Sequence, residues 1–257
     1  MGFLDRFPFS DRNAGLMGIE REFFLVDPLM NKPNPLAQSF LKKIQQTSAS
    51  PEDWTYELSA CQVEHRTKPC DMSGLNGIHE LNNRLFQANR EGVLAAQSIG
   101  YRLSDQNVAA KDMSLEVYPD VRYQKIAAQI PRDTLSAACR VIGTHIHVGA
   151  ISLDDALRIY HRLVANLDQL IASGDRSNGE CLRLYKQMAT NWQPPIYRSA
   201  THFEDVAYQQ GFADNPRNCW HLVRISVHGT VEIRVFGSSL APGPVLCWVM
   251  KIREICR

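Results

Sequence analysis

The chain has 257 residues, of which 44% are hydrophobic and 21% charged, and its formal net charge is +1. This near-neutral balance gives no support for a nucleic-acid surface, which normally carries a basic excess. No apolar stretch approaches the roughly 20 residues that span a bilayer, and Asp5 and Arg6 bring charge too early for a signal peptide. We expect a cytoplasmic protein with one catalytic domain over residues 1–257, in contact with neither a membrane nor a nucleic acid.

The seven cysteines show no spacing typical of a metal site. No Cys-x-x-Cys pair occurs, and most of the cysteines have apolar neighbours. Scattered thiols of this kind are typical of reduced core residues in a reducing compartment. We favour this interpretation over a cysteine nucleophile.

The first half of the chain is predicted to begin with a strand over 16–26 and a loop rich in Pro and Asn. A short helix over 36–46 then leads into extended chain over 54–58 and 60–67. Apolar residues at helical spacing predict a long helix over 75–99, which Gly100 ends. Residues 101–138 carry no readable pattern.

The second half continues the mixture of strands and helices. Its predicted elements are a strand over 140–150, a helix over 153–172 capped by Ser152, a helix over 182–189, a helical turn or two over 203–210, a hairpin of strands over 220–227 and 230–236, and a last apolar helix ending at Arg257. The segment 192–198 holds two adjacent prolines and cannot be regular. Antiparallel strands mixed with long helices predict an α+β fold.

Charged side chains and histidines occur in pairs within three of these strands. The pairs are Glu20 with Glu22, His145 with His147, and Glu232 with Arg234. Strand side chains alternate between two faces, so each pair projects to one side and its apolar neighbours to the other. Mg²⁺ prefers oxygen ligands and shares them with phosphate oxygens, and a guanidinium binds phosphate with parallel N–H groups. The pattern therefore indicates ATP chemistry without a P-loop.

Each pair alone has a simpler interpretation. Glu-x-Glu often marks the solvated face of an edge strand, and a Glu–Arg pair within one strand is a weak ion pair. His-x-His is found on surfaces and in zinc sites, where further nitrogen or sulfur ligands are needed. The polar pairs lie in otherwise apolar strands, several of them bounded by glycine, and their joint occurrence favours a functional site.

Four segments, in this order, resemble the glutamate–cysteine ligase type 2 family. They are Gly18–Asp27, Gln62–Cys70, Gly143–Gly149 and Gly229–Phe236. The family consists of carboxylate–amine ligases with a glutamine-synthetase-like core. The resemblance implies a curved, mainly antiparallel sheet with flanking helices around ATP and two or three Mg²⁺ ions, with Mn²⁺ as an alternative. It also implies amide formation through an acyl phosphate, with γ-glutamyl transfer to an amine as the family's best-known reaction.

The same resemblance implies roles for particular residues. Glu22, Glu57 and Glu64 match ligands of a metal near the substrate, and Glu57 rests only on its spacing to Glu64. Glu20, His145 and Glu232 match ligands of a metal between the ATP phosphates. Arg234 and Glu64 are expected at the reacting groups, with Arg234 on the phosphate or the acceptor carboxylate. His147 is a weaker candidate, either for a position that supports the metal ligands or for the nucleotide.

The chain departs from the family pattern in two places. It stops about twenty residues after the last motif, where a helical region usually follows, so we expect a short version of the domain. The stretch 173–179 and the later Tyr197-Arg198 are also unusual. Arg176 and Arg198 are candidates for binding anionic groups of small-molecule substrates, and solvated loop arginines are an equally good interpretation. The substrates themselves stay open.

Two other functions compete with the ligase. A metal-dependent hydrolase would use His145 and His147 to hold Zn²⁺ and activate water, but this leaves four glutamates in excess. A binding protein that kept the core and lost turnover is the third interpretation. The sequence leaves the oligomeric state open, including a homo-oligomer.

Overall fold

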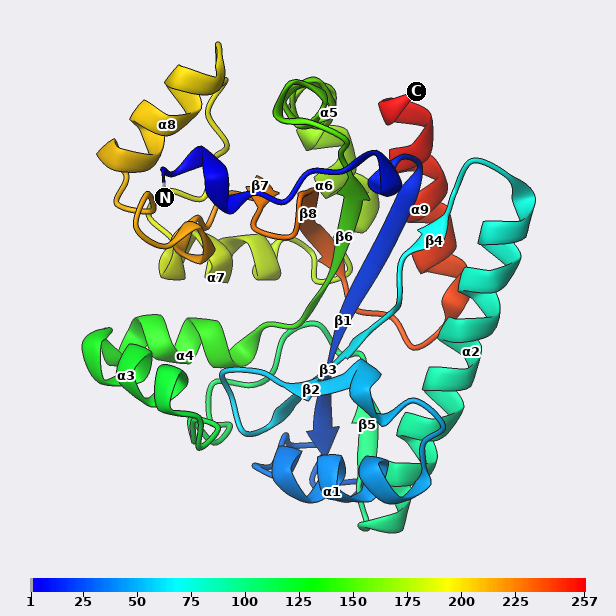
Figure 1. Ribbon diagram of the computed structural model, residues 1–257. Helices are drawn as coiled ribbons and strands as arrows, with labels where there is room; N and C mark the ends of the chain where they lie inside the picture. Colours follow the sequence, from blue (N-terminus) through cyan, green and yellow to red (C-terminus); the bar gives the residue numbers. More distant parts are fainter. Residues whose placement is uncertain (1) are drawn as a thin grey trace.

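The computed structural model describes residues 2–257, and an antiparallel sheet lies at its centre (Figure 1). The main path of the sheet is β2-β3-β1-β6-β8-β7, and the short β4 and β5 pair with β1. Its strands are β1 (Leu16–Val26), β2 (Trp54–Tyr56), β3 (Gln62–Arg66), β4 (Cys70–Asp71), β5 (Arg102–Ser104), β6 (Gly143–Gly149), β7 (Val223–Ser226) and β8 (Thr230–Gly237). Each strand pair is antiparallel. The predicted α+β fold is confirmed.

Helices flank this sheet, with α2 and α9 on one side of the molecule and α3, α4, α7 and α8 on the other (Figure 1). The helices are α1 (Ala37–Thr47), α2 (Leu75–Ser98), α3 (Val121–Gln129), α4 (Arg132–Arg140), α5 (Leu153–Ala165), α6 (Leu167–Gly174), α7 (Glu180–Met188), α8 (Ala200–Gln209) and α9 (Pro242–Cys256). Within residues 2–257 no helix combines the length and the apolar character that a bilayer crossing requires.

Several predicted boundaries were wrong. The helix expected over 153–172 is two helices, α5 and α6, separated at Asn166. The Asn166 side chain donates to the Arg162 carbonyl at 2.8 Å, and such bonds compete with the helical ladder. The strand expected from Arg140 starts at Gly143, because Arg140 is the last residue of α4. The unreadable stretch 101–138 contains β5, α3 and most of α4.

The two faces of β1 differ in chemistry, as its alternation predicts. Met17, Ile19 and Phe23 are buried against the helices, whereas Glu20 and Glu22 are half-buried on the opposite face. On the helical side, the central strands β6, β7 and β8 pack their aliphatic side chains into one core with α5 and α9. Helices α2, α5 and α9 therefore cover one face of the sheet, and the other, open face carries polar side chains, with α4 and α7 beside part of it.

Arg21 lies on the covered face of β1 and is fully buried. Its guanidinium donates to Asn89 Oδ1 at 2.8 Å and to the Ser239 carbonyl at 3.3 Å, and it lies 3.3 Å from His65 Nδ1. Burial lowers the pKa of Arg21 to about 9. Among residues 2–257, no carboxylate forms an ion pair with it. The strand β1 thus carries the Arg21 guanidinium on the face opposite to Glu20 and Glu22.

Candidate active site

Strand register brings the predicted polar pairs together. Directly opposite partners across the sheet are Glu22 and Glu64 on β1 and β3, Glu20 and His145 on β1 and β6, and His147 and Glu232 on β6 and β8. Side chains that face each other across antiparallel strands lie within contact distance. Four neighbouring strands therefore contribute to one polar cluster on the open face of the sheet.

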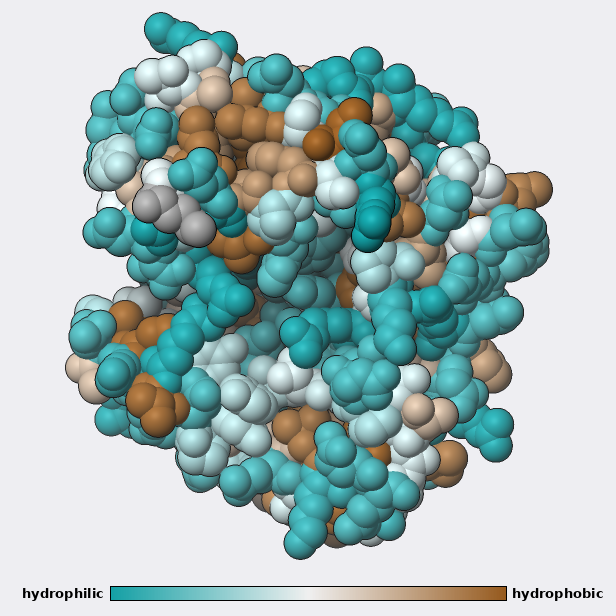
Figure 2. Space-filling view, viewed as in Figure 1, coloured by the Kyte–Doolittle hydropathy of each residue, from teal (hydrophilic) through white to brown (hydrophobic). Residues whose placement is uncertain are grey.

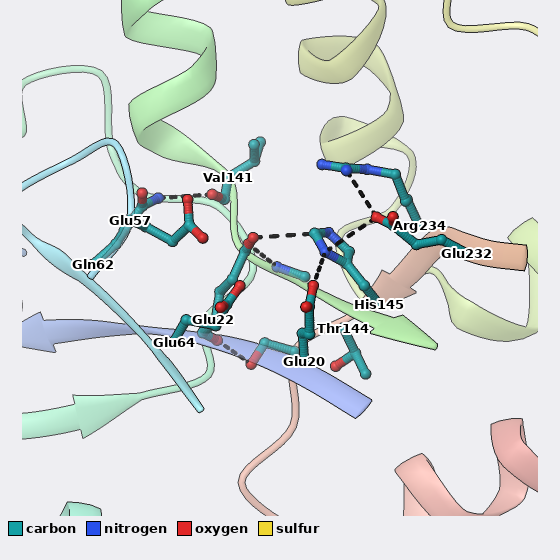
Figure 3. A network of polar contacts seen from close by, with 12 residues as sticks. Glu20, Glu22, Glu57, Gln62, Glu64, Val141, Thr144, His145, Glu232 and Arg234 are labelled. Carbon is teal, nitrogen blue, oxygen red and sulfur yellow. Dashed lines mark hydrogen bonds and ion pairs between the residues drawn. The ribbon is translucent and has the colours of Figure 1, made fainter. Parts of the chain in front are cut away.

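The imidazole of His145 lies at the centre of this cluster (Figure 3). Its Nδ1 is 3.4 Å from Glu20 Oε2 and 3.9 Å from Glu232 Oε1, and its Nε2 is 3.7 Å from Glu22 Oε1. Two groups of three side chains have their ligand atoms within 4.8 Å of one another: Glu20, His145 and Glu232, and Glu22, Glu64 and His145. His145 belongs to both groups, so the two candidate metal positions adjoin.

Glu232 is held between two arginines and is only 1% exposed. Arg224 donates to both of its carboxylate oxygens, from Nε at 2.7 Å and from a terminal nitrogen at 3.1 Å, and Arg234 donates at 2.9 Å. The two guanidinium charges lower the pKa of Glu232 well below its ordinary value, although burial acts to raise it. This carboxylate therefore stays ionised despite its burial.

Arg224 was not predicted from the sequence. The hairpin register pairs Ser226 with Thr230 and Arg224 with Glu232. Counting residues back from the His228-Gly229 turn would have placed Arg224 opposite Glu232. The sequence analysis missed Arg224 because it did not use the register of the hairpin.

Glu20 is the second carboxylate that stays ionised. Burial raises its pKa, but hydrogen bonds with His145 and His147 outweigh this effect and hold the pKa well below its ordinary value. His147 Nε2 lies 3.4 Å from Glu20 Oε2, and His147 Nδ1 lies 2.9 Å from Thr230 Oγ1. Although burial acts to lower the pKa of His147, the charges of Glu232 and Glu20 raise it. His147 thus lies beside the Glu20 group.

Glu22 and Glu64 behave in the opposite way. Burial raises the pKa of Glu22 to about 7, with a further contribution from the charge of Glu57 that His145 and Arg234 partly offset. Burial and the charges of Glu20 and Glu57 raise the pKa of Glu64 well above its ordinary value. Crowded carboxylates of this kind take up protons unless a cation neutralises them. The oxygen-rich donor set fits a hard divalent ion.

Glu57 lies close to these residues but outside both groups of three. It accepts hydrogen bonds from Tyr123 Oη at 3.4 Å and from the Leu58 N–H at 3.3 Å. It also lines the same cavity as Glu22. Glu57 therefore lies beside the group formed by Glu22, Glu64 and His145. The third member of that group is His145 and not Glu57.

Two cavities adjoin the cluster, and the space-filling view shows the molecule hollowed near the centre of this face (Figure 2). The first cavity touches Glu22, His145 and Arg234 and extends between α4 and α7. The second touches Glu20 and His147 and is lined mainly by polar side chains and glycine. The cluster therefore borders two cavities.

The two candidate anion-binding arginines lie in different places. Arg176 lines the first cavity and donates to Ser239 Oγ at 3.3 Å. Arg198 is exposed and lines neither cavity, and its backbone N–H donates to His202 Nδ1 at 3.0 Å. The structure does not bring Arg198 to the cluster.

Comparison with known proteins gives sequence relatives and structural neighbours. A candidate glutamate–cysteine ligase 2-3 of Mycolicibacterium smegmatis is 27% identical over 87% of this chain and 62% of that relative. A glutamate–cysteine ligase of Natronomonas pharaonis is 24% identical over 92% of this chain and 67% of that relative. The chain thus spans a little under two thirds of the first relative's length.

The fold is similar to solved structures of two ligases. Plasmodium falciparum glutamine synthetase matches with a TM-score of 0.53 at 11% identity, over 95% of this chain and 53% of that chain. A bifunctional glutathione synthetase from Pasteurella multocida matches with a TM-score of 0.54 at 13% identity, over 95% of this chain and 39% of that chain. These likenesses show a glutamine-synthetase-like fold. Because the model of the family described as Glutamate-cysteine ligase family 2 (GCS2) matches residues 16–174, this chain belongs to that ligase family.

Proposed function

We propose that this chain is an ATP- and Mg²⁺-dependent ligase that joins a carboxylate to an amine, with glutamate–cysteine ligase-like γ-glutamyl transfer as the model reaction. The observation that carries the proposal is the pair of carboxylate–imidazole groups that share His145. Their oxygens suit hard divalent ions, and two guanidinium groups lie beside them. The family and the structural neighbours support the ligase class.

The residues present fit bound Mg²⁺ and nucleotide. Glu20, His145 and Glu232 would hold a metal at the phosphates, and Glu22 and Glu64, with Glu57 nearby, would hold one at the substrate. Such ions neutralise phosphate charge and polarise the transferring group. Mn²⁺ has similar ligand preferences and would also bind.

The proposed reaction has two steps. A substrate carboxylate oxygen bonds to the γ-phosphorus of ATP, the bond to the bridging oxygen breaks, and ADP leaves. The amine nitrogen then bonds to the acyl carbon, phosphate leaves with the electron pair of the C–O bond, and a neighbouring carboxylate takes the amine proton. In this proposal Arg234 stabilises the transferred phosphate, which is supported by its buried position beside Glu232 and by the N–H groups it has left over.

Five carboxylates against two imidazoles argue against the zinc hydrolase. Borderline ions such as Zn²⁺ favour nitrogen and sulfur ligands. His147 already lies within 2.9 Å of Thr230 through Nδ1, and its Nε2 faces Glu20. The proposed partners are small molecules in the cytoplasm.

An ADP-release screen across pairs of acids and amines tests the proposal. Glu20→Gln and Glu232→Gln should each lower ADP release by about 100-fold or more, because preorganised charge of this kind is typically worth that much. Glu254→Gln, at an exposed position of α9, is the matched control and should keep full turnover.

Two results would overturn the proposal. One is full turnover in either Glu20→Gln or Glu232→Gln, which would remove the metal assignment. The other is bound zinc in the purified protein together with hydrolysis that needs no ATP.

A further inference from the structure

The first cavity adjoins the proposed reaction centre on the side away from Glu20 and His147. It touches Glu22, Glu57 and Arg234, whereas the second cavity touches Glu20, His147 and Thr230. If the nucleotide phosphates lie at the Glu20 group, the first cavity is the space left for the organic substrate. Its lining therefore determines what this chain joins.

Away from the cluster, the walls of this cavity are apolar. The apolar lining comes from Leu182, Tyr185 and Met188 of α7 and from Leu58 and Val141. The Tyr185 hydroxyl is already used, because it donates to the Trp220 carbonyl at 2.9 Å. These walls offer apolar contact and few free polar groups.

Asp175 also lines the cavity, but its carboxylate is engaged by the chain itself. It accepts hydrogen bonds from the Ser177 N–H at 2.9 Å, from Ser177 Oγ at 2.6 Å and from the Gly179 N–H at 2.5 Å. The polar loop over 175–179 is therefore held by its own aspartate. This leaves Asp175 little capacity to bind a substrate ammonium group.

Polar side chains also line the cavity: Glu22, Glu57 and Arg234 at the cluster, and Arg176, whose guanidinium donates to Ser239 Oγ and keeps further N–H groups. Within residues 2–257, neither Asn107 Oδ1 nor Arg234 Nε has a hydrogen-bond partner, although both atoms are buried. These two atoms have almost no accessible surface, and Asn107 Oδ1 lies against Gly237, so the polar groups offered to a ligand are the carboxylates of Glu22 and Glu57 and the rest of the Arg234 guanidinium. A carboxylate and a guanidinium side by side suit a substrate end that carries an amine or a carboxylate.

Trp220 forms part of the rim of the cavity. Its side chain is 38% exposed, and the Arg234 guanidinium lies 5.6 Å from the centre of its ring. A large exposed aromatic beside a buried cation is suited to cover the apolar part of a bound molecule.

We propose that this cavity binds an amphipathic substrate: an amine or carboxylic acid whose polar end lies at Glu22, Glu57 and Arg234 and whose body is an aliphatic or aromatic group about the size of a leucine or phenylalanine side chain. The inference rests on the proposed ligase function and deepens it. It predicts that apolar substrates are used in preference to cysteine or other small polar partners.

The test measures amide by mass spectrometry and ADP release in two arms. One arm fixes L-glutamate as the acid and compares phenethylamine and L-phenylalanine with ethylamine and L-cysteine. The other fixes the best amine and compares phenylacetate with acetate and L-glutamate. The arm in which the phenyl compound has a KM lower by about tenfold or more identifies the partner that fills the cavity.

Variants of the apolar wall then locate the effect. Met188→Gln keeps the side-chain length and should raise the KM for the phenyl substrate about tenfold, with kcat and the KM for its small analogue changed less than about twofold. Leu182→Gln should act in the same way, which guards against misfolding of either variant. Met250→Gln, at a 40% exposed position of α9, is the matched control and should change neither constant.

The outcomes separate this inference from the proposed function. Efficient ligation of cysteine or ethylamine, with no preference for phenyl compounds and no effect of Met188→Gln, would overturn the inference and leave the ligase standing. If no pair gives an amide, the ligase function fails. Calorimetric titration with phenethylamine and phenylacetate then shows whether the cavity binds an amphipathic molecule. Binding that Met188→Gln weakens supports the inference, and no binding of either compound overturns it.

Discussion

The surroundings of Glu22 bring the protonation of its carboxylate into the range of neutral pH. Its pKa of about 7 in the folded protein lies above its ordinary value of 4.5. Between these two values the folded state binds a proton that the unfolded state has lost. Stability contributed by Glu22 is therefore lost as pH rises from about 4.5 through 7.

We predict that Glu22→Gln removes this loss. In metal-free buffer, the free energy of unfolding of the wild type should fall between pH 5 and pH 8 relative to that of Glu22→Gln by about 1–3 kcal/mol. Urea denaturation at both pH values measures the difference. Glu254→Gln should follow the wild type, and parallel curves for the wild type and Glu22→Gln would contradict the argument.

The residues of the site differ in how far the sequence reveals them. Glu20, Glu22, His145 and Glu232 come together because each lies in a strand that its alternation identifies. Arg224 was missed because its place depends on pairing across the hairpin. Tyr123, which contacts Glu57, lies in the stretch that shows no pattern.

At the scale of elements, the β7–β8 hairpin fixes the position of Glu232 and its two arginines. Gly229 in its turn has φ +68°, and a Cβ there would lie 2.5 Å from the Pro8 carbonyl oxygen. The turn thus needs glycine both for its backbone conformation and for the close approach of the N-terminal segment.

Gly229→Ala should destabilise the protein by about 2–4 kcal/mol and reduce ADP release, because both strain and collision displace the hairpin. Gly100→Ala is the matched control, since Gly100 has φ +82° with no atom within 4 Å of the added Cβ. It should cost about 1 kcal/mol, from the backbone alone. Thermal unfolding measures the loss of stability in each variant. Equal losses in Gly229→Ala and Gly100→Ala would contradict the role of the Pro8 contact.

Elements were predictable where one local pattern was sufficient. The boundaries of β1 agree with prediction because half-buried and buried residues alternate from Leu16 to Phe23, and three further buried residues extend the strand to Val26. The elements within 101–138 could not be predicted because tertiary contacts organise this region. The Tyr118 N–H donates to the Leu58 carbonyl, and Tyr56 stacks on Tyr118. No local periodicity reports contacts of that kind.

At the scale of the whole molecule, the cluster links cation binding to stability. A ligand that binds only the folded state stabilises it by about 2.7 kcal/mol at one hundred times its Kd. We predict that MgCl₂ raises the Tm of protein treated with EDTA, and that Glu20→Gln and Glu64→Gln each reduce this rise. Differential scanning calorimetry measures it, with Glu254→Gln as the control. An undiminished rise in both cluster variants would place the cation elsewhere.

The Glu20-Arg21-Glu22 sequence has a consequence for how the strand tolerates change. A shift of β1 by one residue would turn both glutamates into the aliphatic core and bring the Arg21 guanidinium to the cation cluster. The shift would disrupt core packing and charge balance at the same time, so a register of β1 that is wrong by one residue is strongly destabilised. Insertions and deletions inside this strand should therefore be eliminated in a random mutagenesis selection even where single substitutions survive.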